Sequence, residues 1–301
     1  MTGDRRRLVR AALEEGRRRL EGSGLEDPLA EAELLLAAAL GTERVGLHVD
    51  PPDLTTALRA RYEGFVDRRS RREPSGYILG RVEFRSLSFR VDPAVLIPRP
   101  ETEHLVEAAL EWLGKARGAT VVDVGTGSGC IAVSLAHARP DLRVAAVDRS
   151  AAALAVAREN SRTLGTGDRI VFLRGDLLEA VRGPVDLVVS NPPYIAEGEE
   201  VDPEIAFEPR EALYPGGDPV DLYARLARGA ARVLRPGGIL LVETPGARIG
   251  ELTGAFREAG LSTLAPVADL QGRPRVLGAG KPRPTGETPP GDPRPPGARL
   301  R

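Results

Sequence analysis

The residues best suited to chemistry form a short turn at positions 190–194, with the sequence Ser-Asn-Pro-Pro-Tyr. The side-chain oxygen of Asn191 and the main-chain carbonyl of Pro192 can each accept one N–H of a planar NH₂ group. The prolines fix the turn and remove competing N–H donors, and Tyr194 offers a flat face for a planar group. This pattern favours methylation of an amide or an aromatic amine, because the delocalised lone pair of such a nitrogen must be aimed at the methyl carbon. A plain proline-rich turn would explain the prolines but not Asn191 and Tyr194.

A glycine-rich loop at 125–129 (Gly-Thr-Gly-Ser-Gly) indicates a ligand site. Glycines allow the backbone to turn tightly and approach a ligand, and the helix expected after the loop points free N–H groups at the same place. Asp148 lies 19 residues beyond Gly129 and ends the next expected strand, where a carboxylate can accept two ribose hydroxyls. Leu177, with Asp176 before it, follows the third strand, where an adenine edge would lie.

This loop predicts a nucleoside-bearing cofactor. Its spacing is Gly-x-Gly-x-Gly, whereas the dinucleotide fingerprint is Gly-x-Gly-x-x-Gly. The shorter spacing favours S-adenosylmethionine over NAD, because no pyrophosphate has to be seated on the helix.

Four stretches of different pattern must position these residues. Residues 1–75 are predicted to form a small helical domain, and the alternating residues of 76–100 predict a β-hairpin linker. From 101 to 280 strands alternate with helices, and the inner strands are continuous Val, Leu and Ile runs. Residues 281–301 hold seven prolines and three glycines, which predicts a disordered tail.

The part at 101–280 is predicted to be an α/β fold with a doubly wound, mainly parallel, seven-stranded sheet of the Rossmann-like kind. Its strands are expected at 119–124, 142–147, 169–173, 185–190, 238–243, 261–267 and 274–278. In the helical part, Asp27-Pro28 is expected to begin the second of three helices and Gly41 to end it. The arginines of the third helix, through Arg72, are interpreted as a solvated face.

Composition excludes several classes of protein. The 42 Lys and Arg residues nearly balance the 43 Asp and Glu residues, which argues against a protein that coats nucleic acid. A single cysteine, Cys130, and three scattered histidines predict no disulfide and no metal site. With no long apolar run and no signal-peptide pattern, we expect a cytoplasmic protein that does not span a membrane. A monomer would suffice for the chemistry.

Three motifs carry a resemblance to a known family. The turn 191–195 (Asn-Pro-Pro-Tyr-Ile) and the loop 124–129 resemble the amino-methyltransferases that act on planar nitrogens. The run 95–103 (Val-Leu-Ile-Pro-Arg-Pro-Glu-Thr-Glu) is similar to the hallmark of the peptide chain release factor N5-glutamine methyltransferases, the HemK/PrmC family. The runs 77–80 and 208–213 fit this family as well, so that the resemblance covers about residues 30–280.

The resemblance implies a class I methyltransferase fold and a defined reaction. S-adenosylmethionine would methylate the glutamine of the Gly-Gly-Gln loop in class 1 release factors, and the N-terminal helical domain would bind the release factor. The cofactor-binding residues implied are Gly125, Thr126, Gly127, Ser128, Gly129, Asp148, Leu177 and Asn191. The substrate-binding residues implied are Asn191, Pro192, Pro193 and Tyr194, with Asn191, Pro192 and Tyr194 catalytic. Arg99 and Glu103 are expected to shape the mouth of the cofactor pocket.

Two other functions use the same motifs. A nucleic-acid methyltransferase acting on adenine or guanine amines could use this turn, but the acidic segment 197–204 directly after it would repel phosphates. A non-catalytic module that binds S-adenosylmethionine or a translation factor would not need the intact turn.

Overall fold

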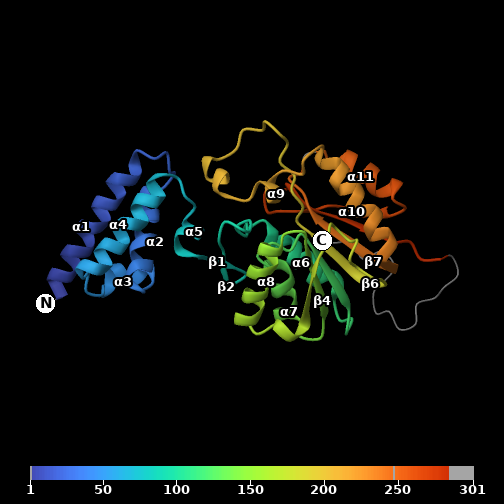
Figure 1. The fold of residues 1–301 in the computed structure, drawn as a ribbon, viewed down its shortest axis with the longest axis horizontal. Coiled ribbons are helices and arrows are strands. Elements are labelled where there is room, and N and C mark those ends of the chain that lie inside the picture. The colour runs from blue at the N-terminus through green and yellow to red at the C-terminus, as the bar shows by residue number, and fades with distance from the viewer. Residues whose placement is uncertain (1, 247, 285–301) are drawn as a thin grey trace. The chain divides into compact units, whose positions relative to one another are not determined.

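The computed structural model describes residues 2–246 and 248–284 (Figure 1). The chain divides into two compact units, one of Met1–Arg81 with Val201–Phe207 and one of Val82–Glu200 with Glu208–Arg301. Most of the tail expected to be disordered, residues 285–301, lies outside the described residues. Within the described ranges, no helix is long and apolar enough to cross a bilayer.

The first unit is a helical bundle. Its helices are α1 (Thr2–Glu21), α2 (Pro28–Leu40), α3 (Arg44–Val49), α4 (Thr56–Ser70) and α5 (Ser75–Leu79). As expected, α2 begins at Asp27-Pro28: the Asp27 carboxylate accepts the Ala30 N–H at 2.9 Å, and Gly41 ends the helix at φ 68°. Helices α3 and α5 were not expected, because six and five residues are too few to show a helical period.

The segment Val201–Phe207, which contains the 3₁₀ helix η2 (Pro203–Phe207), belongs to this first unit. Arg69 of α4 is only 4% exposed and pairs with Glu31 of α2 at 3.0 Å and with Glu204 at 2.8 Å. Arg72 pairs with Asp202 at 2.8 Å. The interpretation of these arginines as a solvated face was therefore wrong for Arg69 and Arg72. They carry ion pairs that fix the segment, because a buried guanidinium needs carboxylate partners.

The second unit contains a two-stranded hairpin and a large sheet. The hairpin joins β1 (Arg81–Phe84) to β2 (Leu87–Arg90), as the alternation predicted. The large sheet has the order β5-β4-β3-β6-β7-β10-β8, with β9 paired to β10. Its strands are β3 (Thr120–Val124), β4 (Arg143–Asp148), β5 (Ile170–Arg174), β6 (Val185–Ser190), β7 (Leu234–Glu243), β8 (Ser262–Thr263), β9 (Val267–Ala268) and β10 (Pro274–Gly280).

This sheet is mainly parallel, as predicted. Strands β3 to β7 pair in parallel, and β10 pairs antiparallel to β7. The described residues give eight strands where seven were expected, because the strand expected at 261–267 is replaced by β8 and β9. Pro266 lies between these two short strands and has no N–H to donate to a ladder, so that one continuous strand is disfavoured.

Both faces of the sheet are covered by helices (Figure 1). The second unit contains α6 (Thr102–Leu113), α7 (Cys130–Ala138), α8 (Ala151–Thr163), α9 (Arg210–Leu213), α10 (Pro219–Val233) and α11 (Ile249–Glu258). Val121 belongs to the core that includes α6 and α7, whereas its neighbour Val122 belongs to the core that includes α10 and α11. Successive residues of a strand point to opposite faces, which is why the inner strands read as unbroken apolar runs.

Candidate functional site

The strand register brings the two predicted motifs to one edge of the sheet. Val124 of β3 pairs with Ser190 of β6, and Ser190 pairs with Val242 of β7. The glycine loop follows Val124 and the Asn-Pro-Pro turn follows Ser190, so that both begin at the carboxyl ends of neighbouring parallel strands. This edge, where the strand order reverses, is the usual ligand site of an open α/β sheet.

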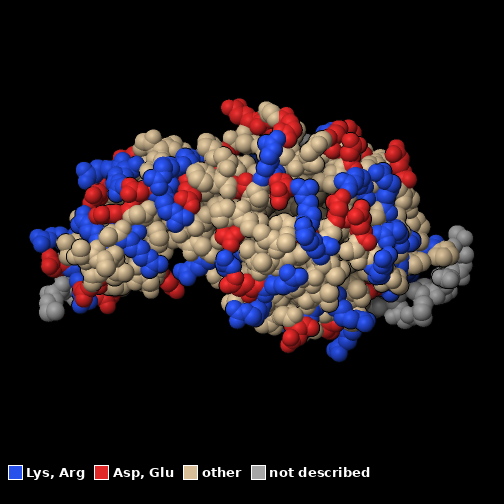
Figure 2. Space-filling model, viewed as in Figure 1, with Lys and Arg blue, Asp and Glu red and all other residues tan. Residues whose placement is uncertain are grey.

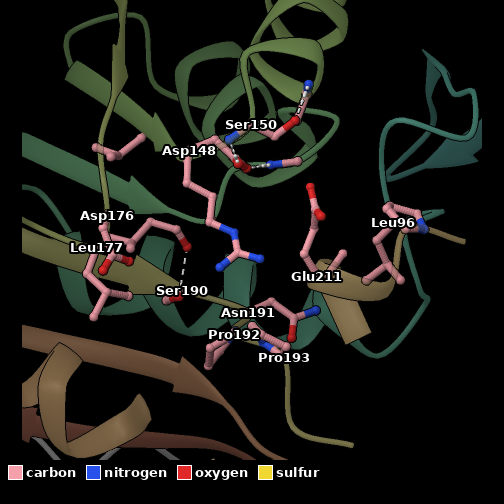
Figure 3. A pocket seen from close by; sticks show the side chains of 18 of the residues that line it. Leu96, Asp148, Ser150, Asp176, Leu177, Ser190, Asn191, Pro192, Pro193 and Glu211 are labelled. Carbon is pink, nitrogen blue, oxygen red and sulfur yellow. Dashed lines mark hydrogen bonds between the residues drawn. The ribbon is translucent and has the colours of Figure 1, made fainter. Parts of the chain in front are cut away.

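A pocket opens at this edge (Figure 3). It spans about 1020 Å³, counting the space that opens to solvent. Predicted residues that line it are Gly125, Gly127, Asp148, Leu177, Asn191, Pro192 and Pro193. The structure therefore brings together residues of the glycine loop, the end of β4, the segment after β5 and the turn after β6.

The glycines of the loop have two different roles. Gly125 (φ 72°) and Gly127 (φ 54°) line the pocket in a backbone conformation that favours glycine. A Cβ built on Gly125 would meet no atom within 4 Å, so this backbone faces open space. Gly129 (φ 82°) instead lies against α8, where a Cβ would come within 3.1 Å of the Ala157 Cβ. The first two glycines keep the pocket wall free of side chains, and the third allows close helix packing.

Thr126 and Ser128 are buried and do not line the pocket. The Thr126 hydroxyl donates to Asp123 Oδ2 at 2.6 Å, and the Ala132 N–H donates to the same oxygen at 3.1 Å. Burial raises the pKa of the Asp123 carboxyl to about 7. Thr126 therefore anchors the loop to the end of β3, and its predicted contact with a cofactor stays a prediction.

The Asp148 carboxylate is held by the backbone on both sides. Its Oδ2 accepts the Gly127 N–H at 2.9 Å and its Oδ1 accepts the Ser150 N–H at 2.9 Å, as the dashed lines of Figure 3 show. Each carboxylate oxygen can accept a further hydrogen bond. Asp148 thus presents a fixed pair of acceptors to the pocket.

Leu177 lines the pocket with an unusual backbone. Its φ of 49° lies in the left-handed region, which a leucine rarely adopts. Such strained residues gather at functional sites. Its neighbour Asp176 pairs with Arg225 of α10, and all three residues line the pocket wall next to β5.

The residues of the turn after β6 differ in whether they line the pocket. Asn191, Pro192 and Pro193 line the pocket, and Pro192 is buried. Tyr194 does not line it; the ring packs with the core between the sheet and α10, and burial raises the pKa of its hydroxyl. The role of Tyr194 as a flat face for the substrate stays a prediction.

Sequence reasoning missed part of the pocket wall. Ala94, Val95 and Leu96 line the pocket, whereas Arg99 and Glu103 do not. Glu103 instead accepts the Arg85 N–H at 2.8 Å and so fixes the turn of the hairpin. Further lining residues are Arg149, Ser150, Glu211, Ala212, Tyr214, Pro215 and Leu222. Val95 and Leu96 belong to the motif at 95–103, so they could have been found from its apolar residues, whereas the prediction had used its charged residues.

Glu208 connects the segments 95–103 and 208–213, whose proximity is not evident from the sequence. Its side chain is 1% exposed, Oε1 pairs with Arg99, and Oε2 accepts the Ile97 N–H at 2.9 Å. The motif at 208–213 thereby holds the motif at 95–103 in place beside the pocket.

Glu208→Ala is expected to lower the free energy of unfolding by about 2 kcal/mol, because the buried Ile97 N–H loses its acceptor. Urea unfolding followed by circular dichroism measures this difference. Glu200→Ala, at an exposed carboxylate, is the matched control and should change stability by less than about 0.5 kcal/mol. Equal stability of the two variants would contradict the structural role of Glu208.

Buried Cys130 is not an activated nucleophile. Burial raises the pKa of its thiol above the ordinary value, which opposes formation of the reactive thiolate. In the part of the chain that the structure describes, no group of three or more His, Cys, Asp or Glu side chains could hold a metal ion. The polar groups that line the pocket are thus backbone, carboxylate, amide and hydroxyl groups together with two arginines.

The chain is similar to known proteins in both units. The model of the methyltransferase small domain matches residues 105–245, and the model of the PrmC N-terminal domain matches residues 11–80. Among solved structures, a methyltransferase from Pyrococcus furiosus aligns with a TM-score of 0.52 at 18% identity, covering 72% of this chain and 98% of that chain. This likeness shows the fold of a methyltransferase with a mainly parallel sheet.

Curated relatives are much closer in sequence. The release factor glutamine methyltransferase of Cereibacter sphaeroides is 44% identical over 87% of this chain and 94% of its own length. That of Moorella thermoacetica is 47% identical over 78% of this chain and 84% of its own length. The chain belongs to the release factor glutamine methyltransferase family.

Proposed function

We propose that this protein transfers a methyl group from S-adenosylmethionine to the side-chain amide nitrogen, N5, of the glutamine in the Gly-Gly-Gln motif of class 1 peptide chain release factors. One observation carries the proposal: Asn191 and Pro192 face the same pocket as Gly125, Gly127 and Asp148. A group that can hold a planar NH₂ thus lies beside a wall that can hold a nucleoside. The curated relatives that carry the name of this activity support the choice of substrate.

The residues of the pocket fit S-adenosylmethionine. Gly125 and Gly127 leave open space along one wall, and the Asp148 carboxylate can accept the two ribose hydroxyls. Leu177 offers an apolar surface for the adenine. When bound, S-adenosylmethionine would supply an electrophilic methyl group; its transfer to the glutamine nitrogen would leave S-adenosylhomocysteine and release one N–H proton to solvent.

The protein's own part in the reaction is to orient the amide. Asn191 Oδ1 and the Pro192 carbonyl accept the two N–H groups of the glutamine, which fixes the plane of its NH₂. Positioning of this kind accounts for a large part of a rate enhancement when the methyl donor is already activated. We assign contact with the glutamine to Pro193 and to the flat face of Tyr194.

The proposed substrate sets the biological context. Methylation of release factors would tune translation termination, in the cytoplasm, by a monomer. We assign binding of the release factor to the helical unit, because residues 11–80 match the PrmC N-terminal domain. The domain division predicted at 1–75, 76–100, 101–280 and 281–301 belongs to this proposal.

Nucleic acid is disfavoured as the substrate. On the face shown in Figure 2, Lys and Arg side chains are interspersed with Asp and Glu and do not form one basic patch. The formal net charge is −1, whereas proteins that bind nucleic acid mainly do so by neutralising phosphates.

The direct test is methylation of a purified release factor, with S-adenosylmethionine, followed by peptide mass spectrometry. We expect one added methyl group on the Gly-Gly-Gln peptide, located on the glutamine. A release factor with that glutamine replaced by alanine is the control and should stay unmodified. Methylation of RNA or DNA with no change to the release factor would overturn the proposal.

A further inference from the structure

The side-chain amide of Asn191 can sit in the site in two ways. Only one of them presents Oδ1 to an N–H of the substrate, whereas the other presents Nδ2, which donates and would repel that N–H. Rotation by 180° exchanges the two at little steric cost. The proposed function therefore requires something that selects one orientation, and the following inference rests on that function.

Two buried side chains behind Asn191 form a hydrogen-bond chain. Asn191 Nδ2 donates to Thr102 Oγ1 at 3.1 Å. The Thr102 side chain forms a further hydrogen bond with the Glu243 carboxyl. Thr102 is 2% exposed and Glu243 is 3% exposed. The order in space is thus Asn191, Thr102, Glu243.

The fold explains how the three residues meet. Ser190 and Val242 pair across β6 and β7, so that Asn191 and Glu243 both stand at the carboxyl end of the sheet. Thr102 is the first residue of α6, and it comes from the motif at 95–103 whose threonine had no assigned role. The charged residues Arg99 and Glu103 of this motif were predicted to shape the pocket, but the residue that contacts the Asn191 amide is Thr102.

A hydroxyl has only one hydrogen to donate. When Glu243 is ionised, its carboxylate only accepts, so Thr102 must give its hydrogen to Glu243. The Thr102 oxygen can then only accept from Asn191, which permits Nδ2 and excludes Oδ1 on that side. We propose that Glu243 and Thr102 act as positioning residues, whose hydrogen-bond polarity turns Asn191 Oδ1 toward the substrate amide.

The surroundings of Glu243 set the pH range in which this polarity holds. In the described structure its Oε2 has no hydrogen-bond partner, so no second donor competes with Thr102 there. Desolvation raises the pKa of the Glu243 carboxyl to about 7, and the Thr102 hydrogen bond opposes that rise. The charged and titratable groups that face it are Glu101, which raises the pKa, Arg275 and Arg99, which lower it, and Tyr194, Tyr223 and Cys130.

Thr102→Val tests the hydrogen-bond chain with almost no change in side-chain shape, because valine replaces the hydroxyl with a methyl group. We expect kcat for glutamine methylation to fall about tenfold to thirtyfold, since an orienting hydrogen bond is lost. The KM for the release factor and the affinity for S-adenosylmethionine should each stay within about twofold. Thr102→Ser keeps the hydroxyl and should recover most of the rate.

Ser134→Ala is the matched control for loss of a buried hydroxyl. Its Oγ is buried in α7 and has no hydrogen-bond partner in the described structure. Removing it should leave kcat unchanged. Thermal unfolding of all variants separates loss of orientation from loss of fold.

A double-mutant cycle separates positioning from other effects of Thr102. In the Asn191→Ala background there is no amide to orient, so adding Thr102→Val should change the residual kcat by less than about twofold. A full tenfold loss in that background would show that Thr102 acts elsewhere and would overturn the inference.

Glu243→Gln tests the polarity itself. Glutamine can either donate or accept, so Thr102 is no longer forced to donate to it, and kcat should fall at pH 8. In the wild-type enzyme, protonation of Glu243 removes the forced polarity in the same way, so kcat should decline as the pH falls through about 7. In Glu243→Gln that step of the pH profile should be missing.

The outcomes distinguish the two proposals. An active wild-type enzyme with Thr102→Val equal to Thr102→Ser would overturn the positioning chain and leave the function intact. An unchanged pH step in Glu243→Gln would also overturn it. A wild-type protein that methylates no release factor would overturn the proposed function, and this inference with it.

Discussion

Replacing Asn191 with alanine is expected to lower kcat for glutamine methylation about a thousandfold, at the upper end of what loss of one charge-stabilising or orienting group costs an enzyme. The Pro192 carbonyl would then hold one N–H alone, and the NH₂ plane could rotate. Most of the orientation that the site provides would be lost with a single side chain. The measurement is single-turnover transfer of a labelled methyl group at saturating S-adenosylmethionine.

Asn191→Ala should leave the fold nearly unchanged. Asn191 is half-buried, and its side chain donates a hydrogen bond to Thr102. Asn191→Asp is the companion variant, because aspartate keeps the acceptor oxygen but loses the Nδ2–H donor to Thr102. If Asn191→Ala retains most of the wild-type kcat, the argument from lone-pair orientation fails.

The second large effect is expected at Asp148. Asp148→Ala should weaken binding of S-adenosylhomocysteine roughly a hundredfold or more, because two hydrogen bonds from ribose hydroxyls to a charged acceptor are lost. The Gly127 and Ser150 N–H groups lose their acceptor as well. Isothermal titration calorimetry measures the affinity directly, without any release factor present.

Asp148→Asn provides the comparison, since asparagine keeps the shape and one acceptor oxygen but carries no charge. Its affinity should lie between that of the wild type and that of Asp148→Ala. Asp168→Ala, at an exposed carboxylate between α8 and β5, is the control and should bind as the wild type does. Wild-type affinity in Asp148→Ala would exclude the ribose contact.

The parts of the site that were predictable from sequence are those encoded locally. Gly125, Gly127 and Asn191 each sit at a strand end, and a strand end can be read from a short apolar run followed by a turn. Because parallel strands end at one edge, their proximity follows from the fold class alone. Asp148 was found in the same way, from its distance along the chain after the loop.

The parts that were missed depend on contacts between distant segments. Glu208 accepts the N–H of Ile97, 111 residues away in sequence, and nothing in either motif names the other as its partner. In the sequence, Thr102 is an ordinary residue at the start of a helix. Only its hydrogen bond with Asn191, 89 residues away, shows that it belongs to the site. Arg69 looked solvated because a helical arginine usually is, but Glu204 and Glu31 surround it.

One strand boundary was wrong for a different physical reason. Pro266 interrupts the strand expected at 261–267, since a proline removes one donor from the ladder. The residue types of this segment predicted an apolar strand. A strand also needs backbone N–H groups that pair with the neighbouring strand, and Pro266 has none. The alternation of Val121 and Val122 between two cores was by contrast predictable, because pleating alone decides it.

The segment Val201–Phe207 has a consequence for how this enzyme can be cut or recombined. The first unit is built from two stretches of chain, because Asp202 and Glu204 pair with Arg72 and Arg69. A chain that begins at Val82 would keep the two acids and lose both arginines. The helical unit is therefore not a detachable block of the gene: exchanging it with that of a relative would require two simultaneous replacements, one of them in the middle of the methyltransferase sequence. Substrate specificity located there would thus be inherited together with the catalytic sequence and would not be shuffled independently of it.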